Sequence, residues 1–217
     1  MDSTGLIILA GTWETLYMVL VAGFFATLFG LPMGVLLWAT QKTHLMQHLW
    51  LNKSLDVFVN VLRSIPFIIL LVAIIPFTRF IVGTSIGTTA AIVPLALCAL
   101  PFVARVVESA LSELGSGLIE AALAMGATNK QIIVRVLLPE ALPAIINGIT
   151  LMLITLVGYS AMAGAVGGGG LGDVAIRYGY QRFEGNVMLV TVLILVLMVQ
   201  LIQISGNYFA RRTAKGF

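Results

Sequence analysis

Long apolar stretches separated by short polar intervals dominate the sequence. Five such stretches occur, at residues 12–39, 57–77, 86–104, 142–166 and 187–204. A helix needs about 20 predominantly apolar residues to cross the hydrocarbon layer of a membrane, and each stretch is close to that length or longer. The pattern therefore predicts an all-α integral membrane protein with five transmembrane helices.

The polar intervals leave no room for a second domain. We expect an outer N-terminal segment at residues 1–11, a transmembrane domain at 12–208 and a cytoplasmic tail at 209–217. The one long interval, residues 105–141, is too polar to span a membrane and too apolar to be disordered. We expect it to form short helices.

The distribution of basic residues predicts the orientation. If the C-terminus is cytoplasmic, only Arg79, Arg177 and Arg182 lie in outer segments, and Arg63 lies at the inner edge of the second span. The other eight of the 12 basic residues then lie inside: Lys42, Lys53, Arg105, Lys130, Arg135, Arg211, Arg212 and Lys215. Cytoplasmic loops carry the excess of Lys and Arg. We therefore expect the N-terminus outside and the C-terminus in the cytoplasm, in a bacterial inner membrane.

Composition excludes a soluble enzyme. The 217 residues are 59% hydrophobic and 10% charged, whereas soluble domains carry about 25% charged residues. The net charge of +3 does not indicate nucleic-acid binding, because the basic residues flank apolar stretches. Cys98 is the only cysteine, so no intrachain disulfide is possible, and we expect it to be a packing residue.

Local signals divide the interval 105–141 into two short helices. Gly126 is suited to the left-handed residue that ends the first helix, and Thr128 with Gln131 forms a capping-box pattern that begins the second. Leu118, Ala122 and Met125 fall on one face of the first helix and predict an exposed apolar patch, which is typical of a partner site. Packing of this face on the membrane surface or under the bundle is the alternative.

The same interval resembles a known family. Glu120-Ala121-Ala122, followed by Gly126, Ile133 and Leu138-Pro139, resembles the EAA motif of permease subunits of bacterial ATP-binding cassette (ABC) importers. The resemblance implies that this segment is the coupling helix, which docks into a groove on a separate ATPase. It implies polar contacts for Glu120, close packing for Ala121 and Ala122, and a turn at Gly126, with Met125 and Ala127 in the same docking segment.

Two further segments narrow the resemblance. Residues 63–67 with 75–79, and residues 155–162 with 164–172, look like the corresponding parts of D/L-methionine importer permeases. This implies the type I ABC importer fold and a permease that moves methionine across the inner membrane. The implied partners are a second copy of the chain, two ABC ATPase subunits and a periplasmic or lipid-anchored methionine-binding protein. No cofactor is expected on this chain, because ATP and Mg²⁺ bind to the partner ATPase.

Other functions stay open at this point. A permease for another amino acid or small polar solute would have the same fold and loop. A channel or secondary transporter would place functional charges in several spans, and only Arg63 and Asp56 come near that. An intramembrane enzyme would need a catalytic cluster, and none is evident in the sequence, so no catalytic residue is expected.

Four side chains are candidates for the translocation path or gate. Tyr159, Ser160 and Met162 place polar and soft side chains in the fourth span, which suits a zwitterion with a thioether tail. Ordinary helix packing is their alternative role. Arg63 lies near the start of the second span, where it either snorkels to the inner interface or lines the cavity.

The glycine run and the histidines do not indicate cofactor chemistry. A phosphate-binding loop needs a lysine after its last glycine, and no lysine follows Gly172. We therefore expect residues 167–170 to form a turn or an outer gate. His44 and His48 have helical spacing but no evident third ligand, so no metal site is expected.

Overall fold

The computed structural model describes residues 3–42 and 44–214, and throughout these ranges the regular elements are helices. Three of them have π-helical hydrogen bonding and are labelled η. In chain order all the helical elements are α1 (Ser3–Ala39), α2 (Leu49–Ser64), α3 (Phe67–Ala73), α4 (Ile75–Val82), α5 (Thr88–Ser112), α6 (Ser116–Ala124), α7 (Asn129–Gln131), η1 (Ile132–Leu137), α8 (Leu138–Ala163), η2 (Gly164–Gly168), α9 (Gly170–Val174), η3 (Ala175–Tyr180) and α10 (Gly185–Ala214).

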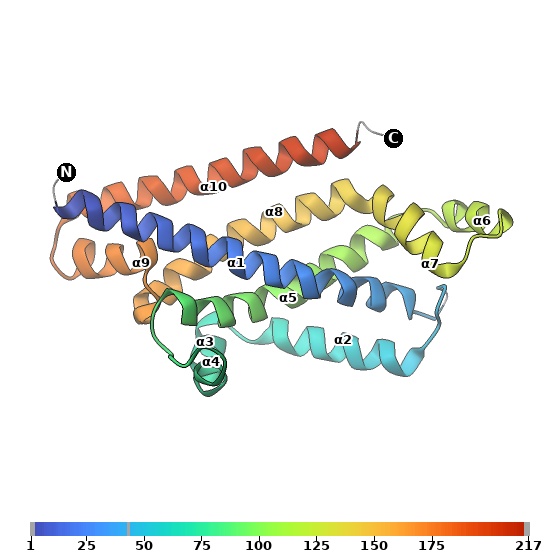
Figure 1. Ribbon diagram of the computed structural model, residues 1–217, viewed down its shortest axis with the longest axis horizontal. Coiled ribbons are helices and arrows are strands. Elements are labelled where there is room, and N and C mark those ends of the chain that lie inside the picture. Colours follow the sequence, from blue (N-terminus) through green and yellow to red (C-terminus); the bar gives the residue numbers. More distant parts are fainter. Residues whose placement is uncertain (1–2, 43, 215–217) are drawn as a thin grey trace.

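The long helices run side by side along one axis of the molecule (Figure 1). Helices α1, α5 and α10, and the run from α7 through η2, are each long and apolar enough to cross a membrane, and the bent pair α2–α3 gives a fifth crossing when it is counted as one broken span. The predicted all-α architecture with five crossings is confirmed in this form. Helices α6 and α7 lie beyond one end of the bundle, and α9 lies near the other.

Glycines bring α1 and α5 into close contact. A Cβ atom added to Gly30 would lie 2.7 Å from Cβ of Val103, and one added to Gly34 would lie 2.6 Å from Cβ of Val107. The spacing of four residues places both glycines on one face of α1, so the backbone of α1 can pack directly on α5. Buried Met18, Ala22 and Ala26 extend this packing along the core.

The second apolar stretch, residues 57–77, does not form one straight helix. Helix α2 begins at Leu49 and ends at Ser64, and the chain then bends by 102° into α3. Ile65 is extended, with φ −84° and ψ 122°. Pro66 explains the break, because proline disfavours helical geometry in the preceding residue and cannot donate a backbone hydrogen bond.

The other helices extend past the apolar stretches. Helix α1 begins at Ser3, so residues 3–11 continue the first helix and do not form a separate segment. Helix α5 reaches Ser112, eight residues beyond the stretch that ends at 104. Helix α10 reaches Ala214, and residues 1–2 and 215–217, with Lys215, lie outside the described residues. The hydropathy pattern shows only the apolar part of each helix. The helices are longer because their backbone hydrogen bonds continue into the polar segments on either side.

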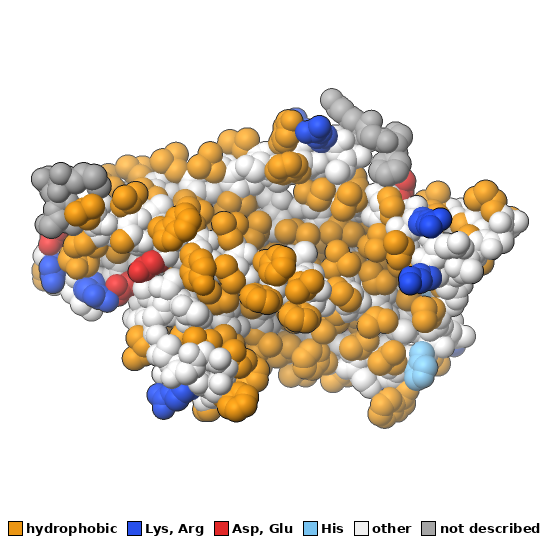
Figure 2. Space-filling view, viewed as in Figure 1, with side chains coloured by type: hydrophobic (Ala, Val, Ile, Leu, Met, Phe, Trp, Pro, Cys, Tyr) orange, Lys and Arg blue, Asp and Glu red, His pale blue; other side chains and the backbone are white. Residues whose placement is uncertain are grey.

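The surface agrees with burial in a membrane. Figure 2 shows a broad apolar face over the middle of the molecule, with the charged side chains around its margins. Exposed large side chains on this bundle include Trp13, Phe24, Phe29, Leu197 and Leu201. In water such a surface would drive association, so lipid or a further subunit must cover it.

Candidate functional site

The segment with the EAA pattern forms a short helix at the end of the bundle. Helix α6 ends at Ala124, and Gly126 has a φ of 76°, which confirms the predicted left-handed residue. Thr128 then begins α7 with a capping box: its backbone N–H donates to Oε1 of Gln131 at 2.8 Å, and its hydroxyl accepts from the backbone N–H of Gln131 at 3.4 Å. The predicted pair of short helices is therefore confirmed.

One face of α6 is exposed and the opposite face is buried. Leu123 and Met125 are 48% and 80% exposed, and Leu118 is 39% exposed. Ala122, in contrast, is only 2% exposed and belongs to the core cluster, so its predicted place in the exposed patch is wrong. The methyl side chain of Ala122 lets α6 pack against the segment that contains Ile133.

Most of the other residues of the docking segment are exposed. Glu120, Ala121 and Gly126 are exposed, and Ala127 is half-buried. The backbone N–H of Ala127 donates to the carbonyl of Ala122 at 3.0 Å, which folds the turn back onto α6. The structure therefore presents an acidic side chain, a small residue and large apolar side chains together beyond the bundle.

Arg63 and Tyr159, two of the four candidates for the path, line one cavity of about 210 Å³. The cavity lies between the end of α2 and the middle parts of α5 and α8. Its other walls, which the sequence reasoning missed, are Ile65, Cys98, Ala99, Phe102, Met152, Thr155 and Leu156. Met152, Thr155, Leu156 and Tyr159 recur at helical spacing on α8, and that spacing was the signal in the sequence.

Packing fixes the position of Tyr159. Its ring stacks on Phe67, with 4.7 Å between ring centroids and an interplanar angle of 3°. Phe67 is the first residue of α3, so the bend after Pro66 brings α3 against α8. The phenol ring therefore has a defined place on the cavity wall.

The other two candidates do not line this cavity. Ser160 is 1% exposed, and its hydroxyl donates to the carbonyl of Val157 at 2.7 Å, within α8. Met162 is 50% exposed near the end of α8. The structure therefore separates the four candidates into a pair at the cavity, one buried residue and one exposed residue.

Arg63 lies near the end of α2, far from the first residue of that helix. It comes fourteen residues after Leu49, which corresponds to about 21 Å along α2 at 1.5 Å per residue. The early start of α2 was not visible in the hydropathy pattern, because Asn52, Lys53 and Asp56 interrupt it.

A polar cluster joins α2 to α5 closer to the docking end. Arg105 of α5 forms ion pairs with Asp56 of α2 and with Glu108, the latter at 2.6 Å. Oδ1 of Asn60 accepts a further hydrogen bond from Arg105 at 2.8 Å, and Gln41 donates to Glu108 at 2.9 Å. Asp56 therefore pairs with Arg105 and not with Arg63.

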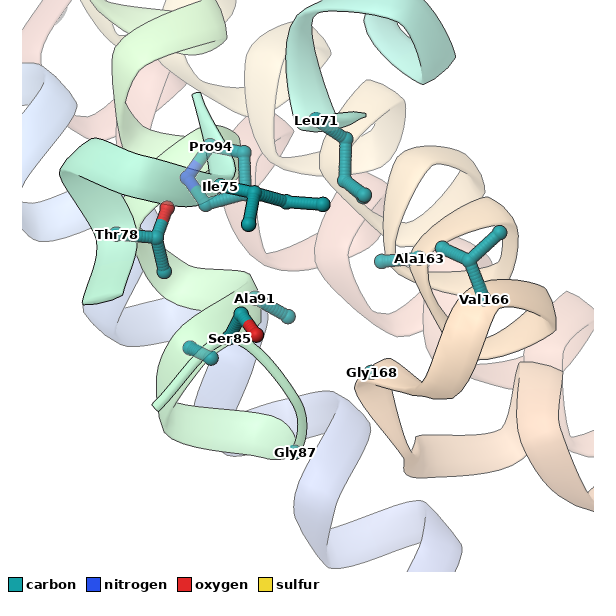
Figure 3. A pocket seen from close by; sticks show the side chains of 11 residues that line it. Leu71, Ile75, Thr78, Ser85, Gly87, Ala91, Pro94, Ala163, Val166 and Gly168 are labelled. Carbon is teal, nitrogen blue, oxygen red and sulfur yellow. The ribbon is translucent and has the colours of Figure 1, made fainter. Parts of the chain in front are cut away.

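The glycine run lies at the opposite end of the bundle. Gly167, Gly169 and Gly170 have φ values of 92°, 76° and 75°, which confirms the predicted turn. The backbone N–H of Gly87 donates to the carbonyl of Gly167 at 2.9 Å, joining the start of α5 to the turn. Figure 3 shows Ile75 facing Ala163 and Val166 across the small space, about 20 Å³, that remains here.

Comparison with known proteins identifies the family. Residues 26–215 match the family described as binding-protein-dependent transport system inner membrane component. The chain is 58% identical, over 95% of its length and 92% of the relative's, to a probable D-methionine transport system permease protein, MetI, of Vibrio cholerae. It is also 58% identical to the D-methionine transport system permease protein MetI of Escherichia coli K12, over 73% of each chain.

Solved structures show the same fold. A chain of the MetNI methionine ABC transporter in an inward-facing conformation matches with a TM-score of 0.96 and 52% identity, over 98% of this chain and 99% of that chain. An amino acid ABC transporter matches with a TM-score of 0.78 at 20% identity, which shows the fold alone. The type I ABC importer fold implied by the sequence is confirmed, and the chain belongs to the family of binding-protein-dependent transport system inner membrane components.

Proposed function

We propose that this chain is the transmembrane permease subunit of an ATP-driven importer that moves D- and L-methionine across the inner membrane. The observation that carries the proposal is the exposed face of α6, which places Glu120 and Ala121 beside Leu123 and Met125 beyond the bundle. A transport subunit of this family needs such a contact with an energy source. The names of the relatives support methionine as the solute.

In the proposed assembly, α6 docks into a groove on a separate ABC ATPase. Glu120 makes polar contacts there, Ala121 allows close approach, and Leu118 and Met125 pack against the groove. Ala122 has a different role from the one implied by the motif, because it faces its own subunit and holds α6 in place. Gly126 and Ala127 form the turn that ends the docking segment.

The proposed machine contains two copies of this chain, two ATPase subunits and a periplasmic or lipid-anchored methionine-binding protein. ATP and Mg²⁺ bind to the ATPases, since the glycine run of this chain has no lysine for a phosphate loop. ATP binding draws the ATPases together and moves the docked α6 helices. That movement favours the outward-open state because ATP binds the two states with unequal affinity.

The orientation places the N-terminus outside and the C-terminus in the cytoplasm. In this orientation α6 and α7 lie on the cytoplasmic side, where ATP is available, and the glycine run lies on the outer side, where the binding protein delivers the solute. The path passes the cavity lined by Arg63 and Tyr159. Met162 acts as a gate side chain near the outer end of α8, whereas Ser160 serves packing.

Uptake by reconstituted vesicles tests this function. The permease and its ATPase are placed in vesicles, the binding protein is supplied outside, and labelled L- and D-methionine are measured inside. We expect uptake that requires both hydrolysable ATP and the binding protein. Uptake without ATP would indicate a channel or secondary transporter, and ATP-dependent uptake of another solute alone would indicate the permease for that solute.

A further inference from the structure

Arg63 is an exposed cation near the end of α2 that lines the cavity of about 210 Å³ and has no ion pair or hydrogen bond among residues 3–42 and 44–214. Asp56 lies seven residues earlier, on the same face of α2, but its carboxylate forms an ion pair with the guanidinium of Arg105. An unpaired charge is costly within a membrane, and such side chains face the bundle interior or a water-filled cavity. The free guanidinium of Arg63 therefore points to a ligand with an opposite charge.

The cavity next to Arg63 has two kinds of wall. Arg63 and Tyr159 supply polar groups, and the hydroxyl of Tyr159 has no hydrogen-bond partner in the part of the chain that the structure describes. Phe102, Met152 and Leu156 supply an apolar wall. Arginine binds carboxylates in a bidentate geometry, and methionine side chains adapt to varied apolar shapes.

The lining residues include no aspartate or glutamate among those that the structure describes. A zwitterion in this cavity would therefore find a cation for its carboxylate but no carboxylate for its ammonium. The volume of about 210 Å³ is smaller than the roughly 300–1,000 Å³ of sites for drug-sized ligands, which restricts the cavity to a small solute.

We propose that this cavity is a transit site for a small amino acid with an apolar side chain. Arg63 binds the carboxylate, the hydroxyl of Tyr159 donates a hydrogen bond to it, and the side chain lies against Phe102, Met152 and Leu156. The inference rests on the proposed function, because it assumes that an amino acid passes through this subunit.

The site explains tolerance of both enantiomers. Distinguishing D from L requires three fixed contacts around the α-carbon, and this cavity fixes only the carboxylate and the side chain. The ammonium group points into open space in either enantiomer. We therefore expect D- and L-methionine to bind equally, within about twofold, whereas methioninamide, which lacks the carboxylate, does not bind.

Cys98 provides a direct readout, because it lines the cavity and is the only cysteine in the chain. The complex with the ATPase partner is purified without the binding protein, and its reaction with N-ethylmaleimide is followed by the intact mass of this chain. We expect saturating D- or L-methionine to slow labelling at least threefold and methioninamide to leave it unchanged. Cys98→Ala confirms that the label reports this residue.

Substitutions of arginine separate a binding role from a structural one. We expect Arg63→Gln to remove the protection by methionine and Arg63→Lys to retain part of it. The matched control is Arg79→Gln, which removes an arginine that lies on α4 outside this cavity and should keep full protection. Size-exclusion chromatography with the ATPase verifies that each variant is assembled.

Several results would overturn the site. Protection by methioninamide, protection retained in assembled Arg63→Gln, or a Cys98 that does not react even without methionine would each do so. If methionine does not slow the labelling of Cys98 in a complex that still imports methionine with ATP, the transit site is refuted and the proposed function stands. Absence of ATP-dependent uptake in the complete system would refute the proposed function itself.

Discussion

The carboxylate of Glu14 in α1 accepts a hydrogen bond of 2.6 Å from the backbone N–H of Gly170, the first residue of α9. The hydroxyl of Thr15 accepts a second, of 2.9 Å, from the backbone N–H of Leu171. Neighbouring side chains of α1 thus satisfy two backbone donors that no residue within α9 can reach. This contact joins the beginning of the chain to the glycine run at the end of the bundle opposite α6.

Substitution of Glu14 tests this contact. We expect Glu14→Ala to lower the stability by about 1–3 kcal/mol, because the N–H of Gly170 loses its partner in a half-buried place. Glu14→Gln keeps an acceptor oxygen and should cost less. The thermal unfolding of the purified complex in detergent measures both. Leu20→Ala, at an exposed position of α1, is the control, and an unfolding temperature equal in all four proteins would contradict this role.

The close contact between α1 and α5 predicts a strong response to added volume. In Gly34→Val the new side chain would collide with Val107, so we expect a loss of about 1–3 kcal/mol and a poor yield of assembled complex. Gly5→Ala is the matched control, because no atom lies within 4 Å of a Cβ atom at that glycine in the same helix. Equal stability of the two variants would show that the helices do not pack as closely as described.

Gly126 tests the turn at the end of the docking helix. No atom lies within 4 Å of a Cβ added there, so Gly126→Val acts only through its φ of 76°, a geometry that costs a β-branched residue about 1–3 kcal/mol. We expect the variant to insert into the membrane but to copurify poorly with the ATPase. Gly117→Ala, in an open place on α6, should copurify normally. Normal assembly and uptake by Gly126→Val would refute the docking role.

The two faces of α6 should respond differently. Met125→Ser removes an exposed apolar side chain, so we expect weaker association with the ATPase and an unchanged stability of the permease itself. Ala122→Leu places bulk in a buried contact and should lower the permease stability by about 1–3 kcal/mol. Copurification and thermal unfolding of the permease distinguish these effects. If Met125→Ser changes membrane attachment and not ATPase binding, α6 lies on the membrane surface.

Signals confined to neighbouring residues were sufficient to predict much of the fold. The lengths of the apolar stretches predicted the crossings, Gly126 predicted a left-handed residue, and Thr128 with Gln131 predicted a cap. Each of these features depends on side chains within one helix turn or on the length of one helix. Such features are therefore visible in a single sequence.

Contacts between distant residues were not predictable in the same way. Asp56 and Arg105 are 49 positions apart and pair only because α2 packs on α5. The face of Ala122 depends on what α6 packs against, and helical spacing alone does not decide that. The length of helix that precedes Arg63 was missed because the polar first half of α2 hid the start of the helix.

Pro101 is a buried residue within α5 and lies between Ala99 and Phe102, which both line the cavity. Proline removes one backbone hydrogen bond from the helix and makes that turn a natural hinge. The part of α5 beyond Pro101 carries Arg105, which ties it to α2, and leads toward the docking helix α6. Bending at Pro101 would swing the part of α5 that contains Arg105 together with α2, and so widen or narrow the space beside Arg63 without moving the turn at Gly167.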